Sequence, residues 1–211
     1  MVTVSFDAIN SSTHLGLFLT EVKIEEPEPK RTVVDVPCRD GELDLTYALS
    51  SSIHYKNRKI KMVFKKTDYT NTWMTVFSNV ANALHGKRMS VSFSNDATWA
   101  WDCFVTVEPE SEYNVGTIEV NCDAFPYKQK TVTLTTTATG AGASVSAAVS
   151  AKPVTPEVTC VNNIMITTGG ETYSFEAGTS TDPNMVLPAG TNTLVVKGSG
   201  AVTINYTDWS L

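Results

Sequence analysis

The chain has 211 residues, 42% of them hydrophobic, which is enough to form the core of one large domain or two smaller ones. Its formal net charge of −6 argues against a nucleic-acid binder with a basic surface. It suits a surface that DNA must pass without sticking, but a mildly acidic balance is also the default for soluble proteins. The sequence contains no run of about 18 apolar residues, which a membrane-spanning helix would need, and its N-terminus does not resemble a secretory signal. We therefore expect no membrane insertion.

Charged residues divide the chain near Lys130. Residues 1–130 hold 14 of the 16 lysines and arginines and 17 of the 22 aspartates and glutamates. Residues 131–211 are instead rich in Thr, Ser, Ala and Gly. A compositional change of this size usually marks a domain boundary. We therefore predict an N-terminal domain over residues 1–130 and a C-terminal domain over residues 131–211.

The N-terminal region begins as strands and loops. TVVDV (32–36) and RKIKMVF (58–64) combine β-branched residues with alternation, which predicts strands. The acidic, proline-containing segment EEPEPK (25–30) cannot continue a strand pairing and predicts a loop.

Acidic residues cluster around a glycine in RDGELD (39–44). Asp40, Glu42 and Asp44 surround Gly41, and such a cluster is one possible cation-binding loop. A calcium-binding hand needs acidic residues at more positions and a glutamate farther along the chain. We therefore interpret the segment as an Asp-Gly turn between extended segments.

Residues 72–85 predict an amphipathic helix, because apolar residues recur at steps of three and four. The core-facing residues of this stripe are Trp73, Val76, Phe77, Val80 and Leu84. Thr70, Asn71 or Thr72 can cap its N-terminus, and Gly86 is a good terminator.

A strand–turn–strand unit follows the helix: MSVSF, the turn SNDA, and TWAWDCFVTV (98–107), before a third strand at GTIEVNC (116–122). Trp99 and Trp101 would share one strand face with Cys103 and Val105, and that face is apolar. The other face, with Ala100, Asp102, Phe104 and Thr106, is mixed. The tryptophans could form a sugar-stacking platform or part of a buried sheet, and we favour core packing under the 72–85 helix.

The C-terminal region predicts a β-sandwich or jelly roll. Its candidate strands, which follow one another at spacings near ten residues, are TVTLTTTAT, ASVSAAVSA, TCVNNIMIT, ETYSFE, NTLVVKG and AVTINYT. The run ATGAGASVSAAVSA (138–151) lacks bulky side chains and should pack weakly, so it predicts a flexible or edge segment.

Cysteine and histidine spacing predicts no metal or catalytic site. The scattered Cys38, Cys103, Cys122 and Cys160 form no C-x-x-C pair, so they are interpreted as structural thiols, with one Cys103–Cys122 bridge left possible. His14, His54 and His85 lie far apart, and His85 is interpreted as a favourable residue at a helix C-terminus. We expect no catalytic residues, no cofactor and no metal.

The order of these segments resembles a known family, the distal tail proteins of long, non-contractile-tailed phages (the siphovirus tail-component family). The segments that carry the likeness are HLGLFL (14–19), VDVPCRDGELDLT (34–46), YKNRKIKMVF (55–64), NALHG (82–86), SFSNDATWAWDCFVTV (92–107), GTIEVNCDAFPYK (116–128) and the C-terminal LPAGTNTLVVKGSGAVTINYTDWSL. The P-x-R-D-G-x-L-D-L-T and C-x-x-x-P-Y patterns are the most specific. One departure bears on the local turn: Cys38 stands where the family usually has Gly.

This resemblance implies a structural role and a mainly β fold with one helix (α+β). It implies a tail-tube-like N-terminal domain of sheet plus helix, and a galectin-like C-terminal β-sandwich. Members form a hexameric ring with a central channel, the distal tail hub. The implied partners are further copies of the chain, the tail tube protein, the tape-measure protein and a tail-associated fibre or lysin. The implied location is the virion tail tip, assembled in the bacterial host cytoplasm.

The alternative is a carbohydrate-binding module that contributes to host cell-wall adsorption. Sugar binding requires an exposed aromatic residue surrounded by polar side chains. The C-terminal region offers Tyr173, Phe175, Tyr206 and Trp209, and its only cations are Lys152 and Lys197. An enzyme would need a paired acid and base or a metal set, which the sequence does not supply.

Overall fold

The computed structural model describes residues 2–49, 52–66, 72–112 and 115–211. The chain divides into two compact units, Met1–Pro126 and Tyr127–Leu211, each with its own hydrophobic core. Lys130, where the composition changes, lies inside the first strand of the second unit. Within the described ranges, no helix is both long and apolar enough to span a bilayer.

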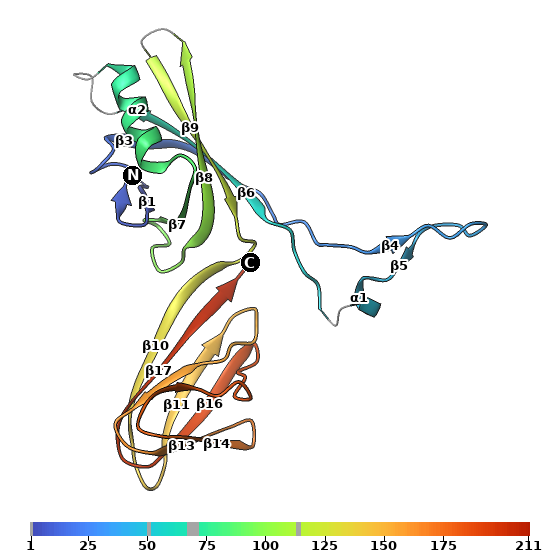
Figure 1. Ribbon diagram of the computed structural model, residues 1–211, viewed down its shortest axis with the longest axis vertical. Helices are drawn as coiled ribbons and strands as arrows, with labels where there is room; N and C mark the ends of the chain where they lie inside the picture. Colours follow the sequence, from blue (N-terminus) through green and yellow to red (C-terminus); the bar gives the residue numbers. More distant parts are fainter. Residues whose placement is uncertain (1, 50–51, 67–71, 113–114) are drawn as a thin grey trace. The chain divides into compact units, whose positions relative to one another are not determined.

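The N-terminal unit is built on one seven-stranded antiparallel sheet, with strand order β2-β1-β7-β8-β9-β6-β3 (Figure 1). Its elements are β1 (Val4–Phe6), β2 (Ile9–Asn10), β3 (Leu17–Ile24), β4 (Val33–Val34), β5 (Leu43–Asp44), α1 (Thr46–Leu49), β6 (Arg58–Lys66), α2 (Trp73–Leu84), β7 (Lys87–Phe93), β8 (Trp101–Glu112) and β9 (Val115–Ala124). The strands predicted at 58–64 and 116–122 are confirmed as β6 and β9.

Helix α2 covers one face of this sheet and contacts β8 and β9. Thr72 is its N-cap, and the Thr72 hydroxyl accepts a hydrogen bond from the Thr75 N–H at 3.4 Å. The other two candidate caps, Thr70 and Asn71, lie outside the described residues. After the helix Gly86 adopts φ +74°, a conformation that glycine reaches without strain, so the predicted terminator is confirmed.

The predicted apolar stripe of α2 enters the core. Trp73, Val76, Val80 and Leu84 are buried, whereas Phe77 is only half-buried and packs against the edge of the core. The Trp73 indole lies against Gly116 of β9, so closely that a Cβ atom at Gly116 would fall 2.2 Å from the ring. Only a residue without a side chain allows the first turn of α2 to approach the sheet this closely.

The β7–β8 hairpin resolves the position of the two tryptophans. Trp101 is buried on β8 with Cys103 and Val105, and its ring meets Phe93 edge-on at 5.7 Å between centroids. Trp99 precedes the strand, where its N–H closes a turn onto the Asp96 carbonyl at 3.1 Å. The prediction of core packing is therefore confirmed for Trp101, but the prediction that Trp99 lies on the strand is wrong, because the turn after β7 is longer than SNDA.

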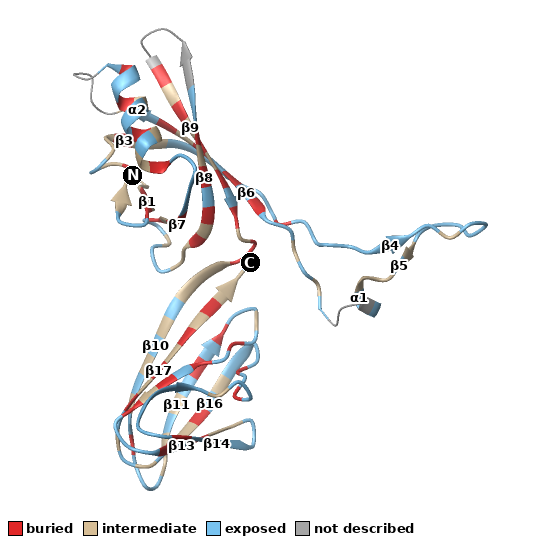
Figure 2. Cartoon of the chain, viewed as in Figure 1, coloured by how far each residue is buried: buried red, intermediate tan, exposed pale blue. Residues whose placement is uncertain are grey.

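Residues 25–49 and 52–57, which we call the arm, connect β3 to β6 and are mostly exposed (Figure 2). At the base of the arm, the Lys30 N–H donates to the His54 carbonyl at 2.7 Å and the Lys56 N–H to the Glu28 carbonyl at 2.8 Å. The strand predicted at 32–36 is shorter than expected: only Val33–Val34 pairs, with β5. The four-residue helix α1 was not predicted, because so short a segment shows no periodicity.

The C-terminal unit is a sandwich of two four-stranded sheets, ordered β10-β17-β12-β15 and β11-β16-β13-β14. Its strands are β10 (Lys128–Ala138), β11 (Ala143–Val149), β12 (Glu157–Cys160), β13 (Ile164–Thr168), β14 (Glu171–Phe175), β15 (Gly178–Thr181), β16 (Gly190–Lys197) and β17 (Gly200–Ser210). Buried residues of both sheets form a single core. The predicted sandwich and the mainly β fold are confirmed.

Two details of this unit differ from the sequence pattern. TCVNNIMIT was predicted as one strand, but it forms β12 and β13, which belong to different sheets and are separated by residues 161–163. The small-residue run contains β11, an edge strand as predicted, yet Ala147 and Val149 are buried in the core. Small side chains therefore pack there rather than leave the segment loose.

Asp208 is a buried polar centre of the sandwich, with 1% of its surface exposed. It accepts hydrogen bonds from the Ser150 N–H and hydroxyl, both at 2.7 Å, and from the Trp209 N–H at 2.9 Å. The Lys130 ammonium lies 3.4 Å away. Burial raises the pKa of Asp208, but the hydrogen bonds together outweigh it, and the pKa lies below its ordinary value. Asp208 thus holds the 150 turn against β17 and β10.

We expect Gly116→Ala to destabilise the N-terminal unit by about 2 kcal/mol, because the new methyl group overlaps the Trp73 ring. Chemical denaturation followed by tryptophan fluorescence measures the loss. Gly140→Ala is the matched control, since a methyl group added there would have no other atom within 4 Å, and its effect should stay within about 0.5 kcal/mol. Equal effects of both variants would contradict the close contact.

We expect Asp208→Ala to destabilise the C-terminal unit by about 3 kcal/mol, because it removes a buried carboxylate that accepts three hydrogen bonds and pairs with the Lys130 ammonium. Hydrogen exchange of the full chain, read by mass spectrometry, reports on this unit separately. The exposed Glu157→Ala on β12 is the control. Since the pKa of Asp208 is lowered, its contribution should persist at neutral pH and fade as the pH falls through that pKa.

Candidate functional site

The histidines serve structural contacts in three separate places. His14 Nδ1 accepts a hydrogen bond from the Asn10 N–H at 3.0 Å, and the His54 carbonyl closes the base of the arm. His85 Nδ1 accepts from the Val107 N–H at 3.0 Å and so ties the end of α2 to β8. His85 is the C-cap residue of α2, at the helix C-terminus where the sequence placed it.

The cysteines are all free thiols. Cys103 and Cys122 are buried on the neighbouring strands β8 and β9, but they form no disulfide. The hydrogen bond to Cys122 and burial raise the pKa of the Cys103 thiol, which keeps it protonated. Among the residues that the structure describes, no three His, Cys, Asp or Glu side chains gather as metal ligands.

The RDGELD segment is a turn in the arm. Gly41 has φ +74°, and the strands that flank the turn, β4 and β5, pair with each other. Asp44 binds the Arg31 guanidinium, with Nη2 at 2.8 Å, and accepts the Thr46 N–H at 2.9 Å. Hydrogen bonds from Thr46 and Arg31 lower the pKa of Asp44 to about 2. Asp44 therefore joins Arg31 to Thr46 across the arm, and its carboxylate is bound by residues of its own chain.

The C-terminal aromatic residues do not form an exposed platform. Phe175 and Tyr206 are buried, and the Tyr206 hydroxyl donates to the Ala148 carbonyl at 2.8 Å. Tyr173 and Trp209 are half-buried against the core. Of the two cations, the Lys152 ammonium lies 3.8 Å from the Tyr127 ring centroid and burial lowers its pKa. These side chains are engaged within the sandwich, which weakens the case for a saccharide site there.

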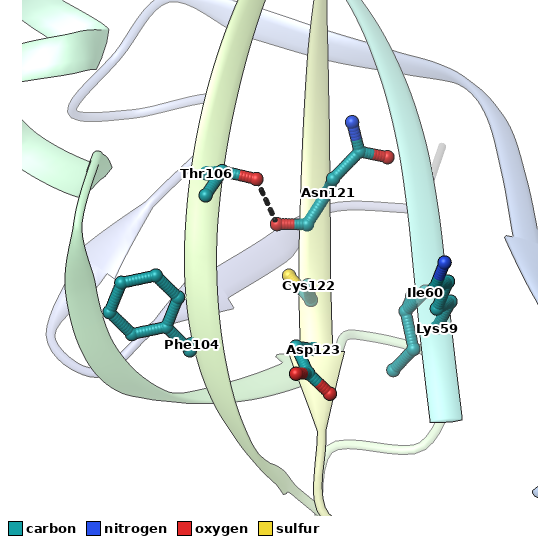
Figure 3. Close-up of a pocket in the computed structure, with 7 residues that line it drawn as sticks. All are labelled: Lys59, Ile60, Phe104, Thr106, Asn121, Cys122 and Asp123. Carbon is teal, nitrogen blue, oxygen red and sulfur yellow. Dashed lines mark hydrogen bonds between the residues drawn. The ribbon is translucent and has the colours of Figure 1, made fainter. Parts of the chain in front are cut away.

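The strongest candidate site is a groove of about 360 Å³ on the sheet of the N-terminal unit, formed by β6, β8 and β9 (Figure 3). Its lining is mixed in chemistry: an aromatic ring, a hydroxyl, an amide, a carboxylate and an ammonium. These side chains belong to Phe104, Thr106, Asn121, Asp123 and Lys59, and Ile60 and Cys122 complete the lining. Because successive residues of a strand face opposite sides, the five polar and aromatic side chains share the face opposite the buried one.

Strand register explains how the groove is assembled. Phe104 lies directly opposite Asp123 across β8 and β9, and Asp123 lies directly opposite Lys59 across β9 and β6. Across β8 and β7, Phe104 lies directly opposite Arg88. With strands about 4.8 Å apart, Phe104, Asp123 and Lys59 form one row about 10 Å wide. Phe104 is 49% exposed, although the face on which it stands is mostly polar.

Charged pairs border this row on both sides. On one side Arg88 Nε donates to Asp102 at 2.8 Å, which lowers the pKa of Asp102. On the other side Lys61 binds Glu119 at 2.5 Å and Asn121 donates to Glu119 at 2.9 Å, and these contacts lower the pKa of Glu119. The groove is therefore a fixed surface between two internally paired charge clusters.

Sequence reasoning missed this groove. The alternation in 100–106 placed Phe104 on a mixed face, and an aromatic residue on a polar face was the signal that could have identified it. Lys59 and Asp123 are 64 residues apart in the chain, and only the strand register brings them together.

Comparison with known proteins identifies the architecture. The crystal structure of the SPP1 Dit (gp 19.1) protein matches this chain with a TM-score of 0.67 at 13% sequence identity, over 100% of both chains. The chain has a Dit-like fold. The resemblance inferred from the segments is thereby confirmed at the level of the fold. SPP1 Dit is described as a paradigm of the hub adsorption apparatus in phages that infect Gram-positive bacteria. No protein-family profile and no curated protein sequence matches the chain.

The residue that departs from the family pattern has an unusual backbone in this Dit-like chain. Cys38 has φ +64°, in the left-handed region that favours glycine. The conformation that a glycine would supply is thus present, although a cysteine occupies the position at a cost of about 1 kcal/mol.

We expect Thr46→Ala to raise the pKa of Asp44 from about 2 toward its ordinary 3.8, because the Thr46 hydroxyl is the strongest contact that holds the carboxylate ionised. NMR titration of the Asp44 side chain measures both values. In the unmodified chain the Arg31–Asp44 pair should persist as the pH falls until about 2, and the variant should lose it earlier. Val34→Ala in the same arm is the control, since the Val34 side chain is 42% exposed and forms no hydrogen bond. An unchanged Asp44 titration in Thr46→Ala would contradict the assignment.

Proposed function

We propose that this chain is a structural component of a siphophage or prophage tail tip. In this proposal copies of the chain form a hexameric ring, the distal tail hub, which joins the tail tube to the baseplate or tail fibre and lets DNA pass. The observation that carries the proposal is the match to SPP1 Dit over the full length of both chains. The segments that resemble distal tail proteins support it independently.

A ring requires two complementary surfaces on every subunit. One candidate is the free edge of β3, an outer strand of the seven-stranded sheet. The Glu25 N–H donates to the Lys59 carbonyl at 2.9 Å, so by alternation the N–H groups of Val22 and Ile24 point away from β6. The side chains of Val22 and Ile24 are 43% and 39% exposed. Such an edge favours pairing with a strand of another chain.

The arm is the second candidate surface. It carries Val33, Val34 and Tyr47, which are 38%, 42% and 67% exposed within a single chain. Apolar side chains on a segment fastened by its own ion pairs and turns favour contact with a neighbouring copy. The edge and the arm differ in shape and composition, as the two sides of a head-to-tail contact must.

The proposal places the protein at the virion tail tip, after assembly in the bacterial host cytoplasm. Its partners are further copies of itself, the tail tube protein, the tape-measure protein and a tail-associated fibre or lysin. The role requires no enzymatic step, no cofactor, no membrane insertion and no specific nucleic-acid binding. A channel protein of net charge −6 agrees with DNA passage without adhesion.

Negative-stain electron microscopy of the concentrated full chain tests the proposal. We expect class averages of six-fold rings with an open channel. If the chain remains monomeric at every concentration, and also in the presence of the tail tube protein, the ring is contradicted.

We expect Val22→Pro to abolish the rings while the subunit stays folded. Proline removes an N–H that points away from β6, so the β3–β6 ladder keeps its hydrogen bonds. Val22→Thr retains the N–H and the β-branched shape and should still form rings. Electron microscopy scores the rings and circular dichroism the fold. Rings that persist in Val22→Pro would show that this edge is not the pairing surface.

A further inference from the structure

The central row of the groove carries side chains that have no partner of their own. Phe104, Asp123 and Lys59 are opposite one another on adjacent strands. Among the described residues, neither the Asp123 carboxylate nor the Lys59 ammonium has a hydrogen bond or an ion pair, even with each other. The rows on both sides differ, since Arg88 is bound to Asp102 and Lys61 to Glu119. The groove is thus a place on this face where an acid and a base lie on neighbouring strands without a bond to any described residue.

The chemistry of this row is that of a polyhydroxylated ligand. The exposed face of Phe104 can stack on the apolar face of a sugar ring. The Asp123 carboxylate accepts hydrogen bonds from hydroxyl groups, and the Lys59 ammonium donates to ring or hydroxyl oxygens. Asn121 and Thr106 are at the adjacent position of the same face. A groove of about 360 Å³ is within the size of small-molecule sites.

The charges in the groove favour a neutral ligand over a charged one. One carboxylate and one ammonium occupy the row, so neither an anionic nor a cationic partner gains a net attraction. The neighbouring charges are neutralised in pairs. A ligand that both donates and accepts hydrogen bonds, with an apolar face for Phe104, fits all three side chains at once.

We propose that this groove binds a neutral oligosaccharide, with Phe104 stacking on a sugar ring and Asp123 and Lys59 bonding its hydroxyl groups. The site lies within one chain, in the N-terminal unit, and does not depend on ring formation. It places saccharide recognition on the sheet rather than in the sandwich, whose aromatic residues are engaged in its core.

Saturation-transfer difference NMR on the full chain tests this site, because the method works for a monomer and for a ring. The probes are chitotriose, maltotriose and cellotriose, each in large excess. We expect saturation transfer to at least one of them, strongest at the protons of one sugar ring face. Phe104→Ala and Asp123→Asn should each weaken binding at least about fivefold.

Met74→Ala is the matched control, since Met74 is 66% exposed on the outer side of α2 and its loss should leave binding unchanged. Circular dichroism and thermal melting establish that each variant is folded. No transfer to any of the probes would overturn the proposal, and so would transfer that survives Phe104→Ala. Binding of a lysine-rich or glutamate-rich peptide in place of the sugars, lost in the same variants, would assign the groove to a protein partner and also overturn it. Electron microscopy decides the ring proposal and saturation-transfer NMR decides the saccharide proposal, so either one can fail while the other holds.

Discussion

A single helix covers a seven-stranded sheet on one face, and most features of the N-terminal unit follow from this arrangement. Side chains alternate between faces along each strand, so β6, β8 and β9 must place apolar residues toward α2 and other residues on the uncovered side. The close approach of Trp73 to Gly116 fixes how near the helix lies. The uncovered face then becomes a largely polar surface on which Arg88 pairs with Asp102 and Lys61 with Glu119, and the groove around Phe104 lies between these two pairs.

The C-terminal unit meets a different constraint, because its two sheets cover each other. Both inner faces supply apolar residues to one core, and even the small side chains of β11 are used there. Asp208 shows how such a core accommodates a charge: every oxygen of its carboxylate is engaged by a neighbouring donor. The aromatic residues that looked available for a ligand in the sequence are therefore part of the packing.

The sequence predicted features that depend on local periodicity. The stripe of α2, the glycine that ends the helix, the strands β6 and β9 and the sandwich were all evident from residue spacing. Features set by tertiary contacts were not: the length of the turn before Trp101, the break between β12 and β13, and the short pair in the arm. The groove could not be predicted, because Lys59, Phe104 and Asp123 become neighbours only through the register of three strands. The side-chain alternation did place Phe104 on the outer face.

The exposure of the Cys38 thiol has a practical consequence. Of the four thiols, those of Cys103, Cys122 and Cys160 are buried and only Cys38 is exposed. A thiol-directed fluorophore or spin label would therefore attach at one place on the native chain, in the segment between β4 and β5 of the arm, without any engineered cysteine. Such a label would report on whether the arm becomes covered when copies of the chain meet, since its environment and its access to quenchers would change at that moment.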